Sequence, residues 1–170
     1  MSEACGFAPI AMQHASVLIL GSMPGRESLE QQRYYAHPRN AFWPIMCRLF
    51  DIDPGAYDAM KHALADRGIA VWDVLQACFR PGSLDSAIEE SSMIINDFPS
   101  FFAAHPHISR VFFNGAKAES IYLRRVLPLL GSVPAGLPLA RLPSTSPAHA
   151  GMSLEQKMEA WKVVLENRLE

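Results

Sequence analysis

Short apolar runs alternate with helical patterns along this chain, and that alternation restricts the fold more than any other feature. The runs predicted as strands are residues 17–20, 69–75, 108–113 and 137–142. Helices are predicted over residues 39–50, 56–67, 94–104 and 116–127, with a last one from residue 153 onward. Strands that alternate with helices form a parallel sheet with helices on both faces. We therefore expect an α/β three-layer sandwich around a central four-stranded, mostly parallel sheet.

The last helix has the most specific local signal. Ser153 followed by Gln156 forms the pattern of a capping box. The apolar residues after it recur at helical spacing, and the predicted buried face is Leu154, Met158, Trp161 and Leu165.

Length and composition indicate one domain over residues 1–170. No stretch approaches the ~20 apolar residues of a membrane helix, and no signal-peptide pattern is present. The three cysteines are Cys5, Cys47 and Cys78, which form neither a metal-binding spacing nor an even disulfide set. We expect a cytoplasmic protein with no membrane association, no cofactor and no metal, since the histidines are also dispersed.

The distribution of charge is more informative than the net charge of −2. Residues 51–100 hold nine acidic and three basic residues, whereas residues 101–150 hold one acidic and five basic residues. Eleven of the fifteen basic residues are arginines, which suit bidentate contact with phosphate. The alternative is a solvated surface with random clustering of charge.

Four loops should meet where the predicted parallel strands end, because ligands of open α/β sheets bind at that edge. These loops are residues 21–38, 76–86, 114–117 and 143–150. The first begins with Gly21-Ser22-Met23-Pro24-Gly25, which is either a cradle of backbone amides or simply a tight turn. It has neither the Lys-Ser/Thr of a P-loop nor the spacing of a dinucleotide fingerprint.

The segment from Tyr35 to Trp43 carries imidazole, amide and aromatic groups. Asn40 is either an N-cap or an amide that orients water or grips a base. One of the adjacent Phe42 and Trp43 is expected in the core, and the other is a candidate to stack on a base.

The remaining loops offer further polar groups, each with a structural alternative. Ser144-Thr145-Ser146-Pro147 and His149 suit phosphate contact or a capped turn. A Ser/His hydrolase is disfavoured, because the chain lacks a Gly-x-Ser-x-Gly elbow. Asp73 within an apolar strand is either structural, which we favour, or a buried general base. Arg80, Ser83, Asp85 and Asn114 are placed to reach the same edge.

Taken together, these loops resemble the uracil-DNA glycosylase superfamily over about residues 16–165. Residues 21–25 look like its Gly-x-x-Pro-Gly motif, and residues 35–43 resemble the Ala-x-Pro-x-Asn-x-Phe-Trp segment of mismatch-specific enzymes. Residues 143–148 look like its Pro-Ser motif, which enters the minor groove. The details are most similar to the hypoxanthine-DNA (deoxyinosine) glycosylase group.

The chain also departs from familiar uracil-removing enzymes. Met23 stands where mismatch-specific enzymes have a catalytic Asn, and the same turn lacks the Asp of strong uracil enzymes. Leu142 stands where the second motif begins with His or Asn. In the hypoxanthine group the Asn of the His-Pro-x-Asn segment is the proposed catalytic residue, which matches Asn40.

The resemblance implies a monofunctional DNA glycosylase of base excision repair, acting as a monomer on DNA that contains a deaminated base, with hypoxanthine favoured. It implies a catalytic Asn40 and a base pocket of Ser22, Met23, Tyr35, His37, Phe42 and Asn114. The DNA-binding residues it implies are Gly25, Arg39, Arg80, Lys117, Ser144, Thr145, Ser146 and His149. The alternatives are a uracil or mismatch-specific glycosylase, a non-catalytic DNA- or nucleotide-binding relative, and a phosphoester hydrolase using Ser144 and His149.

Overall fold

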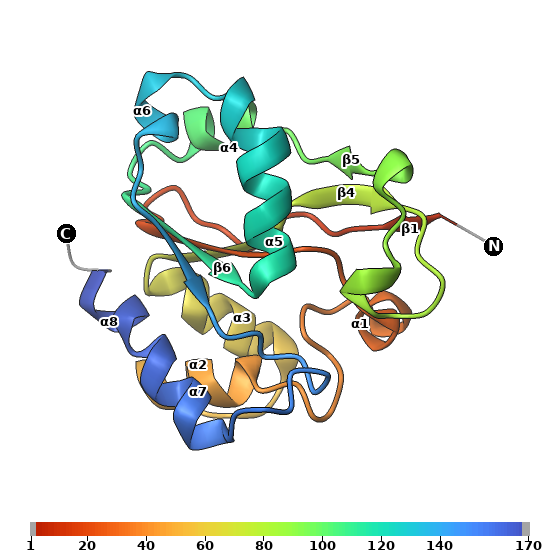
Figure 1. Ribbon diagram of the computed structural model, residues 1–170. Coiled ribbons are helices and arrows are strands. Elements are labelled where there is room, and N and C mark those ends of the chain that lie inside the picture. Colours follow the sequence, from red (N-terminus) through yellow and green to blue (C-terminus); the bar gives the residue numbers. More distant parts are fainter. Residues whose placement is uncertain (1–2, 168–170) are drawn as a thin grey trace.

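The computed structural model describes residues 3–167 and contains the four-stranded parallel sheet that the sequence predicts. Its strands, in the order in which they lie side by side, are β3 (Ile69–Asp73), β2 (Val17–Gly21), β6 (Arg110–Asn114) and β7 (Leu139–Leu142). Each neighbouring pair is parallel. The carboxyl ends of all four strands therefore lie at one edge of the sheet (Figure 1).

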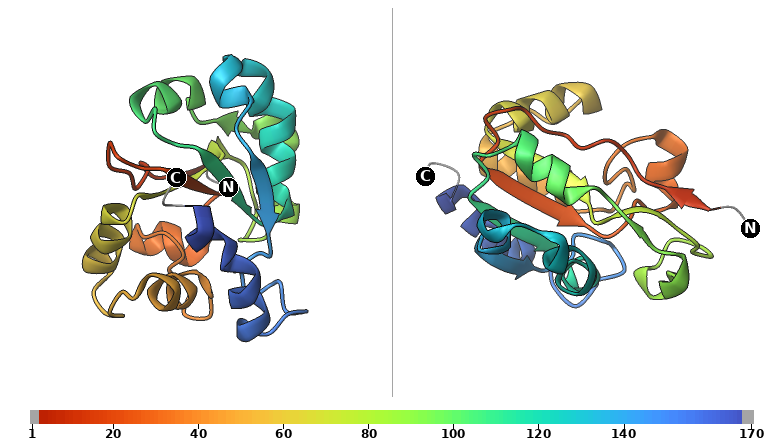
Figure 2. Two further views of the ribbon diagram at one scale, coloured as in Figure 1. Left: turned by 90° about the vertical axis from the view of Figure 1, so that its left-hand side faces the viewer. Right: turned by 90° about the horizontal axis from the view of Figure 1, so that it is seen from above.

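Helices cover both faces of this sheet, as expected for a three-layer sandwich (Figure 2). One face carries α4 (Phe98–Ala104), α5 (Ala116–Ile121) and α6 (Ser132–Ala135), which lie at the top of Figure 1. The other face carries α2 (Phe42–Phe50), α3 (Tyr57–Asp66), α7 (Leu154–Trp161) and α8 (Val163–Asn167). The predicted sandwich is confirmed.

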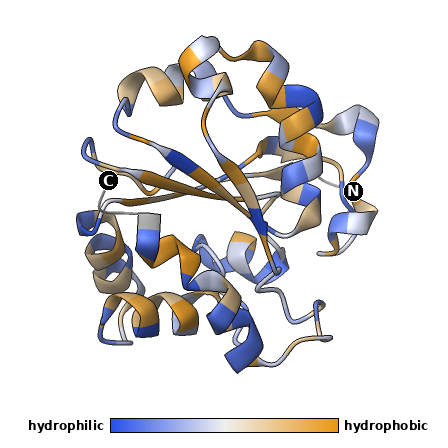
Figure 3. Ribbon diagram, turned by 60° about the vertical axis from the view of Figure 1, so that its left-hand side comes forward, coloured by the Kyte–Doolittle hydropathy of each residue, from blue (hydrophilic) through white to orange (hydrophobic). Residues whose placement is uncertain are grey.

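Side chains along the central strand β2 point alternately to the two faces of the sheet, so the hydrophobic core has two parts. Leu18 and Leu20 belong to the cluster that includes α4 and α5, whereas Val17 and Ile19 belong to the cluster that includes α2, α3 and α7. All four side chains are fully buried, and each contributes on the order of 2 kcal/mol by leaving water. Figure 3 shows mainly orange and tan strands between helices that carry both orange and blue residues.

A small second sheet was not expected from the sequence. Residues 69–75 were predicted as one strand, but β3 ends at Asp73 and the chain continues as β4 (Leu75–Cys78). Strand β4 pairs antiparallel with β1 (Ala4–Cys5) and β5 (Ile94–Ile95). The chain leaves the main sheet here because β2, the partner of β3, ends at Gly21 opposite Asp73.

Two predicted helices differ from the structure. Residues 94–95 form β5, and the helix predicted over 94–104 begins only after Asp97, whose carboxylate caps it by accepting from the Ser100 amide. The helix predicted over 116–127 is regular as α5 only to Ile121. It continues as a wider π-helical turn over Tyr122–Val126 and a 3-10 turn, η4 (Leu127–Leu129), because Pro128 has no amide hydrogen to extend it.

Smaller differences concern the first loop and the ends of two helices. The long first loop contains a short helix, α1 (Arg26–Gln31), and the helix predicted from Arg39 begins at Phe42. The capping box of Ser153 and Gln156 is confirmed. Leu154 was expected to be buried but is 38% exposed, because the first turn of α7 extends past the core.

Candidate functional site

The carboxyl ends of the four parallel strands open into a cavity of about 530 Å³. All four predicted loops contribute to it, so their convergence at one edge is confirmed. Its lining residues are 21–28, Tyr34, Tyr35, His37, Asn40, Asp73, 83–86, Asn114 and 144–149. The first loop supplies the longest part of the wall, which is why the Gly/Pro turn leaving β2 shapes the site.

Buried polar groups form the bottom of the cavity. Ser22, Asp73 and Asn114 each follow or end a strand, and each is at most 8% exposed. Arg26 and His149 line the same cavity but are exposed, so they lie at its mouth. A ligand that enters the cavity therefore meets charged and imidazole groups first and the strand-end groups last.

Asp73 is the most unusual group at the bottom. One of its carboxylate oxygens, Oδ2, is buried and has no hydrogen-bond partner among the described residues. Burial, and after it the nearby charge of Asp85, raise the pKa of this carboxyl to about 7, although Arg80 opposes the rise. Asp85 in turn accepts a hydrogen bond of 2.5 Å from the Ser22 hydroxyl.

Gly21 allows Asp73 and Tyr35 to approach the same point. A Cβ atom at position 21 would lie 2.5 Å from Asp73 Oδ1 and 3.0 Å from the Tyr35 hydroxyl oxygen. Position 21 therefore requires glycine, because any larger side chain would clash with Asp73 and Tyr35. The Tyr35 hydroxyl is buried and, like Asp73 Oδ2, has no hydrogen-bond partner in the described part of the chain.

Tyr35, rather than Phe42, presents an aromatic ring to the cavity. Phe42 was predicted to stack on a base, but it is fully buried and does not line the cavity. Its ring stacks on Tyr35, with centroids 4.1 Å apart and planes inclined by 19°. Phe42 is a core residue because α2 packs that side of the helix against the sheet, and Trp43 is buried beside it.

Asn40 lies between two hollows, the main cavity and a smaller one of about 380 Å³. Its Oδ1 accepts a hydrogen bond of 2.9 Å from the amide of Phe42, the first residue of α2. The N-cap residue of α2 is Ala41, so Asn40 stands one residue before the N-cap position; its side-chain oxygen nevertheless caps the first free amide of the helix. The Nδ2 group makes no hydrogen bond to another described residue. Both alternatives for Asn40 fit this geometry, since one atom caps and the other is available to a ligand.

The 143–149 loop is held in place from three sides. Asn114 exchanges two hydrogen bonds of 2.9 Å with Thr145, and the amide of Ala41 donates to the Thr145 carbonyl. From α7, Trp161 donates to the Pro143 carbonyl and Lys157 donates to the Ser146 carbonyl. Thr145 and Asn114, predicted for DNA and base contact, line the cavity but spend their polar side-chain atoms on this brace.

Ser144 and Ser146 remain at the cavity wall, half-buried. The Ser144 hydroxyl accepts from the Ser146 amide, and the described structure contains no hydrogen bond between Ser144 and His149. The geometry of a Ser/His nucleophile pair is therefore absent from these residues, and the hydrolase alternative gains no support.

Arg80 is a correction to the predicted DNA-binding set. Its guanidinium is buried, and it donates to the carbonyls of Pro24 and Gly82. It ties the 80–86 loop to the first loop, and the Ser83 hydroxyl adds a second tie by accepting from the Arg26 amide. Arg80 is therefore a brace between two loops and is not available to bind a phosphate.

The remaining predicted residues occupy several positions. Met23 and Gly25 line the cavity, as does His37, whose Nδ1 accepts from the Arg39 amide. Arg39 itself borders the smaller hollow. Lys117 does not line the cavity; its Nζ forms an ion pair with Glu90 Oε1 at 3.9 Å.

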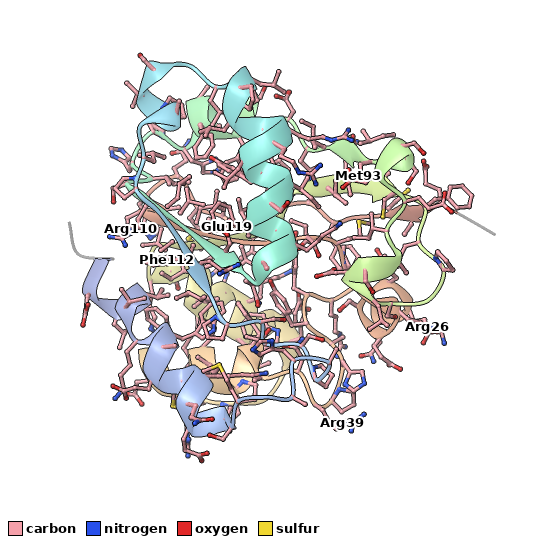
Figure 4. The ribbon with its side chains drawn as sticks, viewed as in Figure 1. Arg26, Arg39, Met93, Arg110, Phe112 and Glu119 are labelled. Atoms are coloured by element: carbon pink, nitrogen blue, oxygen red, sulfur yellow. The ribbon has the colours of Figure 1, made fainter. Side chains whose placement is uncertain are left out.

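Sequence reasoning missed one exposed cation at the mouth, Arg26. It begins α1, inside a segment that was predicted to be a loop. Figure 4 shows Arg26 and Arg39 extending outward on the side of the molecule where α1 lies. A basic residue just after a Gly-x-x-Pro-Gly turn is a signal that could have identified Arg26.

No group of three or more His, Cys, Asp or Glu residues suited to a metal occurs among residues 3–167. Within the same residues, no helix is long and apolar enough to span a membrane.

Comparison with known proteins gives concordant results. The family model of the uracil DNA glycosylase superfamily matches residues 9–170. A hypoxanthine DNA glycosylase of Methanosarcina acetivorans is 34% identical over 161 residues, covering 94% of this chain and 96% of that protein. A hypoxanthine DNA glycosylase of Methanosarcina barkeri is 35% identical over 115 residues, covering 66% and 72% respectively.

The fold has a solved counterpart. A solution NMR structure, described as a candidate uracil DNA glycosylase from Methanosarcina acetivorans, superimposes with a TM-score of 0.81 at 30% identity. The match covers 99% of this chain and 100% of that one.

Proposed function

Because this chain belongs to the uracil-DNA glycosylase superfamily, we propose that it is a single-domain, monofunctional DNA glycosylase that removes hypoxanthine from DNA in base excision repair. The observation that carries the proposal is the cavity at the strand ends, with Asn40 in its wall and unpartnered polar groups at its bottom. Two relatives named hypoxanthine DNA glycosylase support the choice of base. We further propose that the enzyme is monomeric and cytoplasmic.

The cavity suits a base that has left the duplex. The glycosidic bond is hidden within the base stack, so an enzyme of this kind extrudes the nucleotide into a pocket. The volume of about 530 Å³ is ample for one nucleotide. The base enters first and reaches the buried strand-end groups, while the sugar and phosphates stay near the exposed residues at the mouth. Ser144, Ser146, Arg39 and Arg26 are placed to hold phosphates there.

Asn40 is proposed to act on the reacting bond. Its Oδ1 is committed to the Phe42 amide, which fixes the direction of the side chain. The Nδ2 group is then a preoriented donor for the attacking water or for the departing base, whose developing negative charge it stabilises. As the bond breaks, the sugar becomes cationic, and the phosphates of the DNA itself stabilise that charge.

Two substitutions separate the catalytic from the capping role of Asn40. Asn40→Asp keeps the oxygen that caps α2 but loses the Nδ2 donor, whereas Asn40→Ala loses both. In single-turnover assays both variants should release hypoxanthine at a rate lower than that of wild type by about 10²-fold or more. Only Asn40→Ala should also lose about 1 kcal/mol of stability. If Asn40→Asp keeps the wild-type rate, the residue is a cap alone.

The substrate panel for this assay holds oligonucleotides with inosine, uracil, xanthine or a G·T mismatch. Release of hypoxanthine supports the full proposal. Uracil is the second candidate, because its N–H and adjacent carbonyl present the same hydrogen-bonding edge as hypoxanthine. Release of uracil alone would support a DNA glycosylase of this superfamily but contradict hypoxanthine as its substrate base. Binding of inosine-containing DNA with no release from any substrate would indicate a non-catalytic relative.

A further inference from the structure

A large apolar side chain is exposed at the mouth of the main cavity. Leu84 lines the cavity and is 57% exposed, whereas Met23 in the same lining is buried. The other exposed large apolar side chains of residues 3–167 lie outside this lining; they are Ile94, Leu123, Leu129, Val133 and Leu154. In water Leu84 gains nothing from the hydrophobic effect, so a bound partner that covers it would gain binding energy.

Hydrogen bonds of both neighbouring residues hold Leu84 in place. The Ser83 hydroxyl accepts from the Arg26 amide at 2.8 Å, and the Asp85 carboxylate accepts from the Ser22 hydroxyl at 2.5 Å. Both bonds tie the 80–86 loop to the first loop, and in Figure 1 the two lie side by side at α1. Because the backbone is already fixed, little conformational entropy is lost when the leucine contacts a partner.

The wall on the other side of the cavity has a different character. The loop with Leu84 comes after β3 and β4, whereas residues 144–149 come after β7, at the other end of the strand order. Residues 144–149 line the cavity with small or polar side chains and contain no leucine, isoleucine, methionine or phenylalanine. The mouth therefore has one apolar side and one polar side.

A base inside the cavity leaves a gap in the duplex just outside it. The extruded nucleotide stays joined to its neighbours, so the gap lies at the mouth. Opening the stack costs free energy and exposes the flat, apolar faces of the two adjoining base pairs. Proteins that distort DNA insert apolar side chains, leucine among them, between such base pairs. Leu84 is a side chain of this kind, placed where the gap forms.

We propose that Leu84 enters the gap left by the extruded nucleotide and packs against the neighbouring base pairs. This inference rests on the proposed glycosylase function and adds the residue that keeps the damaged base out of the stack. Leu84 then acts on the position of the nucleotide and not on the reacting bond. The polar wall of residues 144–149 is left to contact the sugar and phosphates.

This role predicts a difference between duplex and single-stranded substrates. A single strand has no paired stack to open, so the cost that Leu84 offsets is small there. The assay is single-turnover release of hypoxanthine from one inosine-containing oligonucleotide, single-stranded or annealed opposite cytosine, with enzyme below saturation. Leu84→Ala should slow release from the duplex by about 10- to 30-fold, the factor expected for burial of a leucine side chain. Its rate on the single strand should stay within about 2-fold of wild type.

Two further substitutions and a control distinguish packing from a general defect. Leu84→Met keeps a large apolar side chain and should stay within about 3-fold of wild type on the duplex. Leu84→Asn is similar in size but polar, so it should lose as much activity as Leu84→Ala. Leu129→Ala is the matched control, because Leu129 is 60% exposed and does not line the cavity; both of its rates should equal those of wild type.

A binding measurement makes the test independent of turnover. Fluorescence anisotropy gives the affinity for an oligonucleotide with 2′-fluoro-deoxyinosine, which resists cleavage, as a duplex and as a single strand. Leu84→Ala should weaken binding to the duplex probe by about 10-fold or more and leave binding to the single strand unchanged.

The outcomes separate this inference from the proposed function. If wild type releases no base and Leu84→Ala still weakens binding to the duplex probe alone, the glycosylase proposal fails and the role of Leu84 stands. Equal losses on duplex and single strand would mean that Leu84 contacts the base inside the cavity, and would overturn the inference. Wild-type rates of Leu84→Ala on the duplex, or release of hypoxanthine by wild type from single strands only, would also overturn it.

Discussion

Replacing Asp73 with asparagine should stabilise the folded protein at alkaline pH and leave it almost unchanged at acidic pH. Burial raises the pKa of the Asp73 carboxyl from 3.8 to about 7 in the folded chain. Between these values the folded protein holds a proton that the unfolded chain has released. The free energy of unfolding therefore falls as the pH rises through this range, and it levels off above pH 7, where both states are ionised.

The size of the effect follows from that difference in pKa. A tenfold change in a protonation equilibrium corresponds to about 1.4 kcal/mol, so the ionised Asp73 costs the fold about 4 kcal/mol at pH 8. The neutral amide of the Asp73→Asn variant carries neither the proton nor the charge. The variant should match wild type only near pH 3, where both states of wild type are protonated; it should exceed wild type by about 2 kcal/mol near pH 5 and by up to about 4 kcal/mol at pH 8.

The assay is urea unfolding followed by the fluorescence of the three tryptophans, from about pH 5 to about pH 8.5. Asp53→Asn is the matched control, because Asp53 is an exposed carboxylate. A plot of the free energy of unfolding of Asp53→Asn against pH should run parallel to the plot for wild type. Parallel curves for Asp73→Asn would refute the reasoning, since they would mean that Asp73 titrates alike in both states. Lower stability of Asp73→Asn at pH 8 would mean that the ionised carboxylate has a partner in the fold.

Three further predictions concern strand cleavage, phosphate contact and packing. Purified protein should not nick abasic DNA. Nicking needs a free lysine amine near the site, and the Nζ of the buried Lys157 donates instead to the Ser146 carbonyl. Nicking on a gel that disappears in Lys157→Met or Lys117→Ala would contradict the proposal that the enzyme only hydrolyses the glycosidic bond. Arg26→Ala and Arg39→Ala should each weaken DNA binding and reduce the slope of affinity against salt by about 1, and an unchanged slope would exclude phosphate contact. Phe42→Ala should lose about 3–5 kcal/mol in urea unfolding and release hypoxanthine more slowly, because Tyr35 loses its stacking partner; a loss under about 1 kcal/mol would contradict its place in the core.

Much of the fold follows from local pattern. The four strands were predictable because each is a short apolar run between helical segments, and their parallel order follows from that alternation. The convergence of four loops at one edge follows from the same rule. The break after Asp73 was not predictable, because residues 69–75 are apolar throughout except for that one residue, and the break depends on where the partner strand β2 ends.

Site residues divide along the same line. Local sequence pattern was enough to place Ser22, Asn40 and Ser144 at the strand-end cavity, because each follows a strand or precedes a helix at that edge. It did not distinguish a group that faces the cavity from one that braces a loop. Arg80 and Thr145 carry the right chemistry for DNA, but tertiary contacts direct their polar atoms to Pro24 and Asn114.

The roles of Phe42, Tyr35 and Asp73 depend on tertiary packing and could not be assigned from local pattern. Which ring is core and which lines the cavity depends on how α2 packs on the sheet, and adjacent aromatics in a sequence carry no such information. Asp73 reads as structural in a strand of apolar residues. The raised pKa of its carboxyl and the lack of a hydrogen-bond partner for its buried Oδ2 depend on which groups other segments place beside it. Local pattern sets the elements and their edge, whereas desolvation and hydrogen-bond pairing depend on residues distant in the chain.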